Sequence, residues 1–283
     1  MFISIREEII KIMIFFIDKH RLLDVLYKKE IQRRKVMIYI TGDMHGNAEK
    51  LSKTELSMLT AKDTLIICGD FGFIWNNDVK ENQFLNRLEK RKYNICFIDG
   101  THENFDVLNE LPVAVWNGGR VHKVRSNIFH LMRGQVYEIE NKKIFTMGGG
   151  EDPDFDLNEY DENTVRKEIP TSQEMLTGVT NLEKHGYKVD YIISHEPPAK
   201  IKDFLSLSEN KSIRATALGA YLDELSQQTE FEKWYFGSMH TDKFITEKYT
   251  ALFNKIICPQ TPIESKSDFK KKFLLKPSQR EDK

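Results

Sequence analysis

Three short apolar runs near the start of the sequence are each followed by a glycine and by side chains suited to metal or phosphate chemistry. Asp43 and His45 come after the run MIYIT, Asp70 comes after TLIIC, and His102 comes after NICFI. The three groups are separated by roughly 30 residues, the length of one βαβ repeat. Because ligands bind where the carboxyl ends of parallel strands meet, we expect these side chains to lie together at one sheet edge.

Two histidines further along the chain occupy comparable places. His195 directly follows the run YIIS, and His240 follows WYFGSM. A lone histidine is more often structural than functional, so the prediction depends on the joint pattern of Asp and His at successive strand ends. Carboxylate and imidazole ligands together suit Mn, Fe, Zn or Co better than Ca or Mg alone. The pattern therefore predicts divalent metal, and an aspartate shared by two ions would suit phosphoryl transfer.

The elements that must position these residues alternate between strand and helix. Short β-rich runs are expected at 37–41, 64–68 and 94–98, with helical stretches near 48–59 and 79–92. Alternation of this kind indicates βαβ units and a parallel sheet. Later helices are expected over 172–185 and within 213–225, and later strands at 189–194, 233–236, 244–246 and 250–257.

The middle of the chain has a different pattern. Alternating runs at 120–124, 128–132, 136–140 and 143–147 follow one another closely and predict an antiparallel meander. The segment Glu151–Glu162 that follows is strongly acidic. We interpret it as a solvated loop, with an active-site lid or specificity loop as the alternative.

The overall composition and charge of the chain bear on nucleic-acid binding and on the cellular compartment. The chain has 42 basic and 43 acidic residues and a net charge of −1, so its overall charge does not support nucleic-acid binding. Cys68, Cys96 and Cys258 are widely spaced and odd in number, which suits a reducing compartment. We therefore expect a cytoplasmic protein, while its oligomeric state is not indicated.

The expected organisation has three parts. Residues 1–36 are predicted to be an N-terminal helical extension, residues 37–259 a single domain, and residues 260–283 a polar, basic tail. The apolar stretch Ile9–Ile17 is shorter than the roughly 20 residues that span a bilayer, so we do not expect membrane insertion. A second interpretation of the extension is that Met37 is the natural start.

The order of these motifs resembles the calcineurin-like metallophosphoesterase superfamily. The run Asp-x-His, Gly-Asp, Gly-x-His-Glu, His and Gly-x-x-His covers nearly all of residues 37–257 and is most similar to small bacterial or phage members. The resemblance implies an α/β fold of two mixed β-sheets packed face to face with helices outside. It also implies an enzyme that hydrolyses a small phosphomonoester or phosphodiester with a metal-bound hydroxide.

The resemblance also implies roles for individual residues. The first metal would be held by Asp43, His45, Asp70 and His240. Asp70 would bridge to a second metal, which His195 would also bind. His102 would be the acid that protonates the leaving oxygen or steadies the transition state, a task that suits an unperturbed histidine.

Two positions depart from the family pattern. The usual Gly-Asn-His-Glu has Thr101 in place of Asn, and the usual Gly-His-x-His has Ser238 in place of its first His. Both missing residues would be ligands of the second metal, for which a hydroxyl is a poor substitute. Three outcomes stay open: a weakly bound second ion, a one-metal enzyme, or an inactive relative that binds a phosphorylated ligand or a protein partner.

Overall fold

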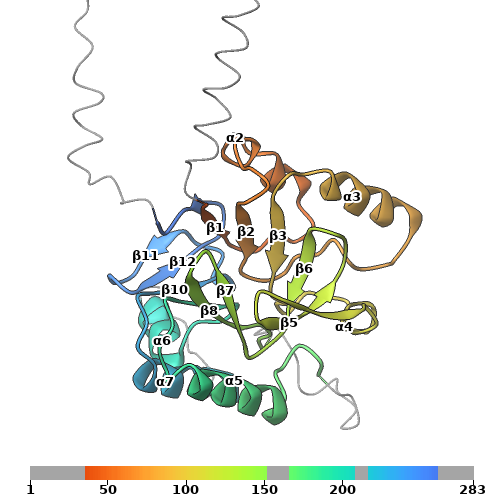
Figure 1. The fold of residues 1–283 in the computed structure, drawn as a ribbon. Helices are drawn as coiled ribbons and strands as arrows, with labels where there is room; N and C mark the ends of the chain where they lie inside the picture. The colour runs from red at the N-terminus through yellow and green to blue at the C-terminus, as the bar shows by residue number, and fades with distance from the viewer. Residues whose placement is uncertain (1–35, 152–165, 208–215, 261–283) are drawn as a thin grey trace, which may run out of the picture. The chain divides into compact units, whose positions relative to one another are not determined.

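The computed structural model describes residues 36–151, 166–207 and 216–260 (Figure 1). From Met37 onward these residues belong to one compact unit. The expected helical extension, the acidic segment after Glu151 and the basic tail lie outside the described residues. Among the described helices, none is long and apolar enough to cross a membrane.

The described residues form thirteen strands and seven helical segments. The strands are β1 (Ile38–Thr41), β2 (Thr64–Ile67), β3 (Asn94–Phe97), β4 (Val113–Trp116), β5 (Gly119–Lys123), β6 (Ile128–Leu131), β7 (Gln135–Ile139), β8 (Lys142–Met147), β9 (Tyr191–Ser194), β10 (Lys233–Phe236), β11 (Lys243–Phe244), β12 (Tyr249–Ala251) and β13 (Ile256–Ile257). The helical segments are the 3₁₀-helix η1 (Ala48–Ser52) and the α-helices α2 (Thr54–Ser57), α3 (Val79–Glu89), α4 (Phe105–Asn109), α5 (Ser172–Lys184), α6 (Ala199–Leu207) and α7 (Ala217–Gln228).

The strands form two mixed sheets within the described part of the chain (Figure 1). The seven-stranded sheet has the order β13-β1-β2-β3-β6-β5-β4, and the six-stranded sheet has the order β11-β12-β10-β9-β8-β7. In the first sheet β1, β2, β3 and β6 are parallel. In the second sheet β8, β9, β10 and β12 are parallel. The predicted site residues follow the carboxyl ends of five of these strands, β1, β2, β3, β9 and β10.

A shared apolar core shows that the two sheets pack face to face. One buried cluster contains, from the first sheet, Ile38, Ile66, Cys96 and Leu131 and, from the second, Tyr137, Ile144, Ile193 and Tyr235. Leu56, Leu85 and Leu108 of α2, α3 and α4 pack on the outer face of the first sheet. Leu182, Leu222 and Leu225 of α5 and α7 pack on the outer face of the second sheet. The expected sandwich with helices outside is confirmed.

The expected antiparallel meander in the middle of the chain is wrong. β5 pairs with β6 in the first sheet and β7 pairs with β8 in the second, so the four runs divide between the sheets. Gly134 lies between the two pairs with a φ of +69°, and a Cβ there would lie 2.7 Å from the backbone nitrogen of Gly178. Alternation along a strand reports which face is buried but does not identify the neighbouring strand. The pattern also missed β4, α4 and α6.

Candidate metal centre

The loops after β1 and β2 place Asp43, His45 and Asp70 side by side. β1 and β2 are parallel and in register at Thr41 and Ile67, so their following loops leave the sheet together. The backbone nitrogens of Met44 and His45 both donate hydrogen bonds to the carbonyl of Asp70, at 3.1 and 2.7 Å. His45 and Asp70 have φ values of 48° and 43°, a conformation that costs energy outside glycine. The hydrogen bonds between the loops hold this strained geometry in place.

Two glycines allow the backbone to approach the carboxylates closely. A Cβ at Gly100 would lie 2.0 Å from Oδ1 of Asp70, and one at Gly237 would lie 1.9 Å from Oδ1 of Asp43. No side chain fits at such distances. The glycines before His102 and His240 are therefore needed to bring the chain against the two aspartates.

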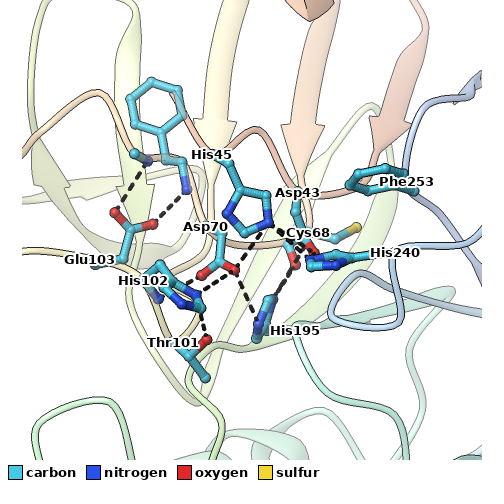
Figure 2. Close-up of polar contacts among 12 residues, drawn as sticks. Asp43, His45, Cys68, Asp70, Thr101, His102, Glu103, His195, His240 and Phe253 are labelled. Carbon is cyan, nitrogen blue, oxygen red and sulfur yellow. Dashed lines mark hydrogen bonds and ion pairs between the residues drawn. The ribbon is translucent and has the colours of Figure 1, made fainter. Parts of the chain in front are cut away.

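Four of the predicted ligands come together as one group (Figure 2). Asp43, His45, Asp70 and His240 each present a ligand atom within 4.8 Å of the others. Nε2 of His240 lies 3.4 Å from Oδ2 of Asp43, and Nε2 of His45 lies 3.6 Å from Oδ2 of Asp70. The two Nε2 atoms lie 3.0 Å apart. Ligands from the loops after β1, β2 and β10 thus converge from both sheets.

His195 and His102 flank this group on the Asp70 side (Figure 2). Nε2 of the buried His195 lies 3.8 Å from Oδ2 of Asp70, and its Nδ1 lies 3.5 Å from Oδ1 of Asp43 and 3.0 Å from the carbonyl of Cys68. Nδ1 of His102 lies 3.3 Å from Oδ2 of Asp70, while its backbone nitrogen donates to Oδ1 at 2.8 Å. All six side chains predicted from the sequence therefore gather at one place. Their roles as ligands or catalysts stay predictions.

Charge and burial at Asp43 fit a cation. Its side chain is fully buried, and neither carboxylate oxygen has a hydrogen-bond partner among the described residues. Burial raises the pKa of Asp43. The nearby imidazoles of His195, His240 and His45 outweigh this effect of burial and hold the pKa well below its usual range. Burial lowers the pKa of His195, but Asp70 and Asp43 raise it to about 10. A proton on His195 thus balances charge that a divalent ion could balance in its place, so the donor set fits such an ion.

The two hydroxyls that replace expected ligands have different surroundings. Oγ1 of Thr101 lies 2.9 Å from Nδ1 of His102 and is therefore engaged with the neighbouring ring. Oγ of Ser238 is buried and has no hydrogen-bond partner in the described part of the chain. Ser238 also has a φ of 41°, so its backbone is held in a strained conformation. Neither hydroxyl reproduces an imidazole or amide donor.

Three residues that contact the predicted ligands or their loops carry weaker sequence signals or none. Nζ of Lys50 donates to the carbonyl of Asp43 at 2.6 Å, and the ring of Phe253 lies 5.0 Å from that of His240. The buried Glu103 accepts a hydrogen bond from the backbone nitrogen of Phe71 at 2.6 Å and so joins the loops after β2 and β3. Glu103 belongs to the Gly-x-His-Glu motif, but no motif marks Lys50 or Phe253.

Comparisons with known proteins agree with these motifs. Residues 36–251 match the family of calcineurin-like phosphoesterases. The chain is 25% identical to a lariat debranching enzyme from Drosophila pseudoobscura pseudoobscura over 239 residues, which are 72% of this chain and 42% of that protein. This chain therefore spans less than half the length of that relative. A solved structure of phosphopantetheinyl hydrolase from Mycobacterium tuberculosis aligns with a TM-score of 0.40 and 13% identity over 77% of this chain and 90% of that one. With its two-sheet fold and a family match across most of its length, the chain belongs to the calcineurin-like phosphoesterases.

Proposed function

We propose that this protein hydrolyses a phosphomonoester or phosphodiester of a small molecule with the help of divalent metal. The buried carboxylate of Asp43 carries the proposal. Among the described residues neither of its oxygens has a hydrogen-bond partner, and the rings of His45, His195 and His240 lie within ion-pair distance, at 4.0, 3.5 and 3.4 Å. A buried carboxylate is costly unless a cation or hydrogen bonds compensate it. Mn, Fe and Zn suit the mixed oxygen and nitrogen donors that Asp43, His45, Asp70 and His240 provide.

Beyond the first metal group, Asp70 would also take part in a second metal subsite. A divalent ion in this group would polarise a phosphoryl oxygen and lower the pKa of a bound water. Asp70 lies beside His45, His102 and His195, which supports the proposal that two subsites share its carboxylate. The second subsite would be the weaker one, because it offers hydroxyls from Thr101 and Ser238 where the family has stronger donors.

The proposed proton donor is His102. Its side chain is 57% exposed, and its Nδ1 faces Oδ2 of Asp70 and Oγ1 of Thr101. Its Nε2 has no hydrogen-bond partner in the described part of the chain. The anchored Nδ1 therefore fixes the ring, while Nε2 is left to donate a proton to the leaving oxygen of the ester.

A second candidate function is that of a weakened or inactive relative that binds a phosphorylated ligand or a protein partner. The buried, unpartnered Oγ of Ser238 favours it, because a strong donor is missing where a second ion would be held. The first group of ligands is complete under both candidates. The two functions therefore differ at the second subsite.

The decisive experiment is Mn²⁺-dependent hydrolysis of bis(p-nitrophenyl) phosphate. We expect wild type to turn over, a chelator to stop it, and Asp43→Asn to lower the rate at least a hundredfold. Thr101→Asn/Ser238→His should be as active as wild type or more active. Activity only in this double variant would favour the binding protein, and activity that resists the chelator would contradict metal dependence.

We also propose a cytoplasmic location. Cys68, Cys96 and Cys258 are all free thiols, and the first two are buried in the core. Free cysteines persist in reducing compartments. Fractionation of cells that express the full chain tests this, and recovery outside the cytoplasmic fraction would contradict it.

A further inference from the structure

The loop that carries His102 is anchored at both of its ends. It runs from Asp99 to Glu103, which are both buried, while the side chain of His102 between them is 57% exposed. At the far end, Glu103 accepts hydrogen bonds from the backbone nitrogens of Phe71 and Gly72, at 2.6 and 3.4 Å (Figure 2). Glu103 belongs to the Gly-x-His-Glu motif, but Asp99 lies outside it. The motif therefore describes only one of the two anchors.

The other anchor, Asp99, is held by Arg133 from the turn between β6 and β7. Nε and Nη2 of Arg133 both donate to Oδ2 of Asp99, at 2.8 and 2.7 Å. Oδ1 lies 3.0 Å from Nε2 of His130, whose Nδ1 lies 2.9 Å from Nδ1 of His122 on β5. Burial raises the pKa of Asp99, but Arg133 and His130 hold it well below its usual range. An ionised carboxylate that accepts two bonds from one guanidinium is fixed in direction as well as in place.

The same guanidinium joins two further segments of the chain. Nη1 of Arg133 donates to Oε2 of Glu174 in the first turn of α5, at 3.1 Å. Nη2 contacts the backbone carbonyls of Lys167 and Glu168, at 2.9 and 3.1 Å. Each nitrogen of the guanidinium thus has an acceptor among the described residues. Arg133 therefore links the anchor at Asp99 to α5 and to the segment that precedes it.

These linked segments meet the loop of His102 from the side of the second sheet. The backbone nitrogen of Gly149, after β8, donates to the carbonyl of Asp99 at 2.9 Å. The backbone nitrogen of Gly150 donates to the carbonyl of Glu168 at 3.0 Å. A Cβ at Gly150 would lie 2.9 Å from Cγ2 of Thr101. The guanidinium therefore supports both chain segments that approach each other at Thr101.

The position of the loop decides how His102 faces the metal centre. Its backbone nitrogen donates to Oδ1 of Asp70 at 2.8 Å, and its Nδ1 lies 3.3 Å from Oδ2. Gly100 passes so close that a Cβ there would lie 2.0 Å from Oδ1 of Asp70. A displacement of the anchor at Asp99 would therefore move His102 relative to Asp70. A misplacement of about 1 Å in a reacting group can slow a reaction roughly a hundredfold.

We propose that Arg133 is a positioning residue for the reaction, which holds Asp99 from behind and so fixes the loop in which His102 faces Asp70 and the ester. Arg133 is buried, and its charge is paired with Asp99 and Glu174, so it acts through the loop and does not bind the phosphate. Its effect on the reaction rests on the proposed function, whereas its effect on the order of the loop does not.

Hydrogen exchange on the full chain, without metal, tests the loop directly. The variant is Arg133→Met/Asp99→Leu, because replacing both members of a buried ion pair by apolar side chains is often neutral or stabilising, whereas removing one member destabilises the fold. The amide of His102, which bonds to Asp70, should exchange about tenfold faster than in wild type, because the loop opens locally. The amide of Cys68, which donates to a carbonyl of β1 at 3.0 Å, should exchange as in wild type.

Two results of this exchange experiment would overturn the proposal. One is wild-type exchange at His102, and the other is an equal acceleration at His102 and Cys68, which would show that the pair only stabilises the fold. Arg125→Met is the matched control. Arg125 also donates to side chains, those of Asn82 and Asn86 at 2.7 and 2.9 Å, but it does not contact the loop of His102. This variant should leave the exchange of the His102 amide unchanged.

Kinetics with two esters then test the effect on proton donation. In Arg133→Met/Asp99→Leu we expect kcat to fall about tenfold for phenyl phosphate and less for p-nitrophenyl phosphate, whose better leaving group needs less help from an acid. KM should change little, because Arg133 does not touch the substrate. An equal loss with both esters, or a rise in KM alone, would overturn the positioning role. An inactive wild type whose His102 amide responds as expected would contradict the proposed function alone, and the anchoring of the loop by Arg133 would stand.

Discussion

Lys50 lies over the ring of Phe253, with its Nζ 3.6 Å from the ring centroid (Figure 2 shows Phe253 beside His240). The same ammonium donates to the carbonyl of Asp43 at 2.6 Å. Phe253 in turn packs against His240, with ring centroids 5.0 Å apart. One cation therefore supports two of the proposed ligands, one from each sheet.

Replacing Lys50 with methionine should weaken metal binding more than it weakens the fold. Lys50→Met keeps an apolar stem on Phe253 but removes the donor to Asp43, so we expect Mn²⁺ affinity to fall about tenfold by calorimetry, the equivalent of about 1.4 kcal/mol. Lys53→Met is the control, because Lys53 donates to Asn254 of the same loop and not to Asp43. Equal Mn²⁺ affinity in the two variants would contradict a supporting role for Lys50.

Metal should stabilise wild type, and this stabilisation should require Asp43. At a Mn²⁺ concentration 100 times Kd, binding to the folded state adds about 2.7 kcal/mol to the free energy of unfolding. Asp43→Asn should lose this gain, and without metal it should also be less stable than wild type, because it removes the buried ion pairs with His195 and His240. Chemical unfolding with and without chelator measures both effects. Asp106→Asn, at an exposed carboxylate, should keep the full metal response.

Removing the hydroxyl of Thr101 should slow proton donation by His102 without changing the affinity for the first metal. Thr101→Val removes the hydroxyl that lies 2.9 Å from Nδ1 of His102, so the ring is less firmly held. We expect kcat to fall about tenfold for phenyl phosphate and less for p-nitrophenyl phosphate, whose better leaving group needs less help from an acid. Thr101→Ser should restore the rate. An equal loss with both esters, or a changed Mn²⁺ affinity, would assign Thr101 another role.

The ion pair of Asp99 and Arg133 should make stability depend on pH. The folded pKa of Asp99 lies below its unfolded value of about 3.9, so the ionised group stabilises the fold above that pH, and this contribution is lost as the pH falls through the folded pKa. Asp99→Asn should lower the free energy of unfolding by about 3–5 kcal/mol at pH 7, because Arg133 is left buried and unpaired. The difference from wild type should narrow below about pH 4. Urea unfolding at several pH values measures it, and a difference that does not change with pH would contradict the ion-pair explanation.

The convergence of the site residues could be predicted from the sequence, because it depends on their positions at successive strand ends and on the topology of the sheets. Each of Asp43, Asp70 and His102 follows a strand of a parallel set, and parallel register alone brings such positions together. His195 and His240 follow β9 and β10, which are parallel neighbours in the other sheet. Spacing along the chain therefore carried most of the information about the site.

The supporting contacts were not predictable because they join distant segments without a repeated pattern. Lys50 and Phe253 are 203 positions apart, and only the packed fold brings the ammonium onto the ring. The alternating runs that became β5 to β8 did not reveal that the chain changes sheets at Gly134. For the same reason the pairing of His122 with His130 became visible only once β5 and β6 lay side by side.

The proposed ligands belong to both layers of the sandwich, and this has a consequence beyond chemistry. His45 and His240 are 195 positions apart in the chain, yet their ring nitrogens lie 3.0 Å from each other. An ion held between them would tie the two layers together at their shared edge and close a very long loop, which disfavours partial opening. The supply of metal in the cell would then govern how long the protein survives proteolysis as well as how fast it works.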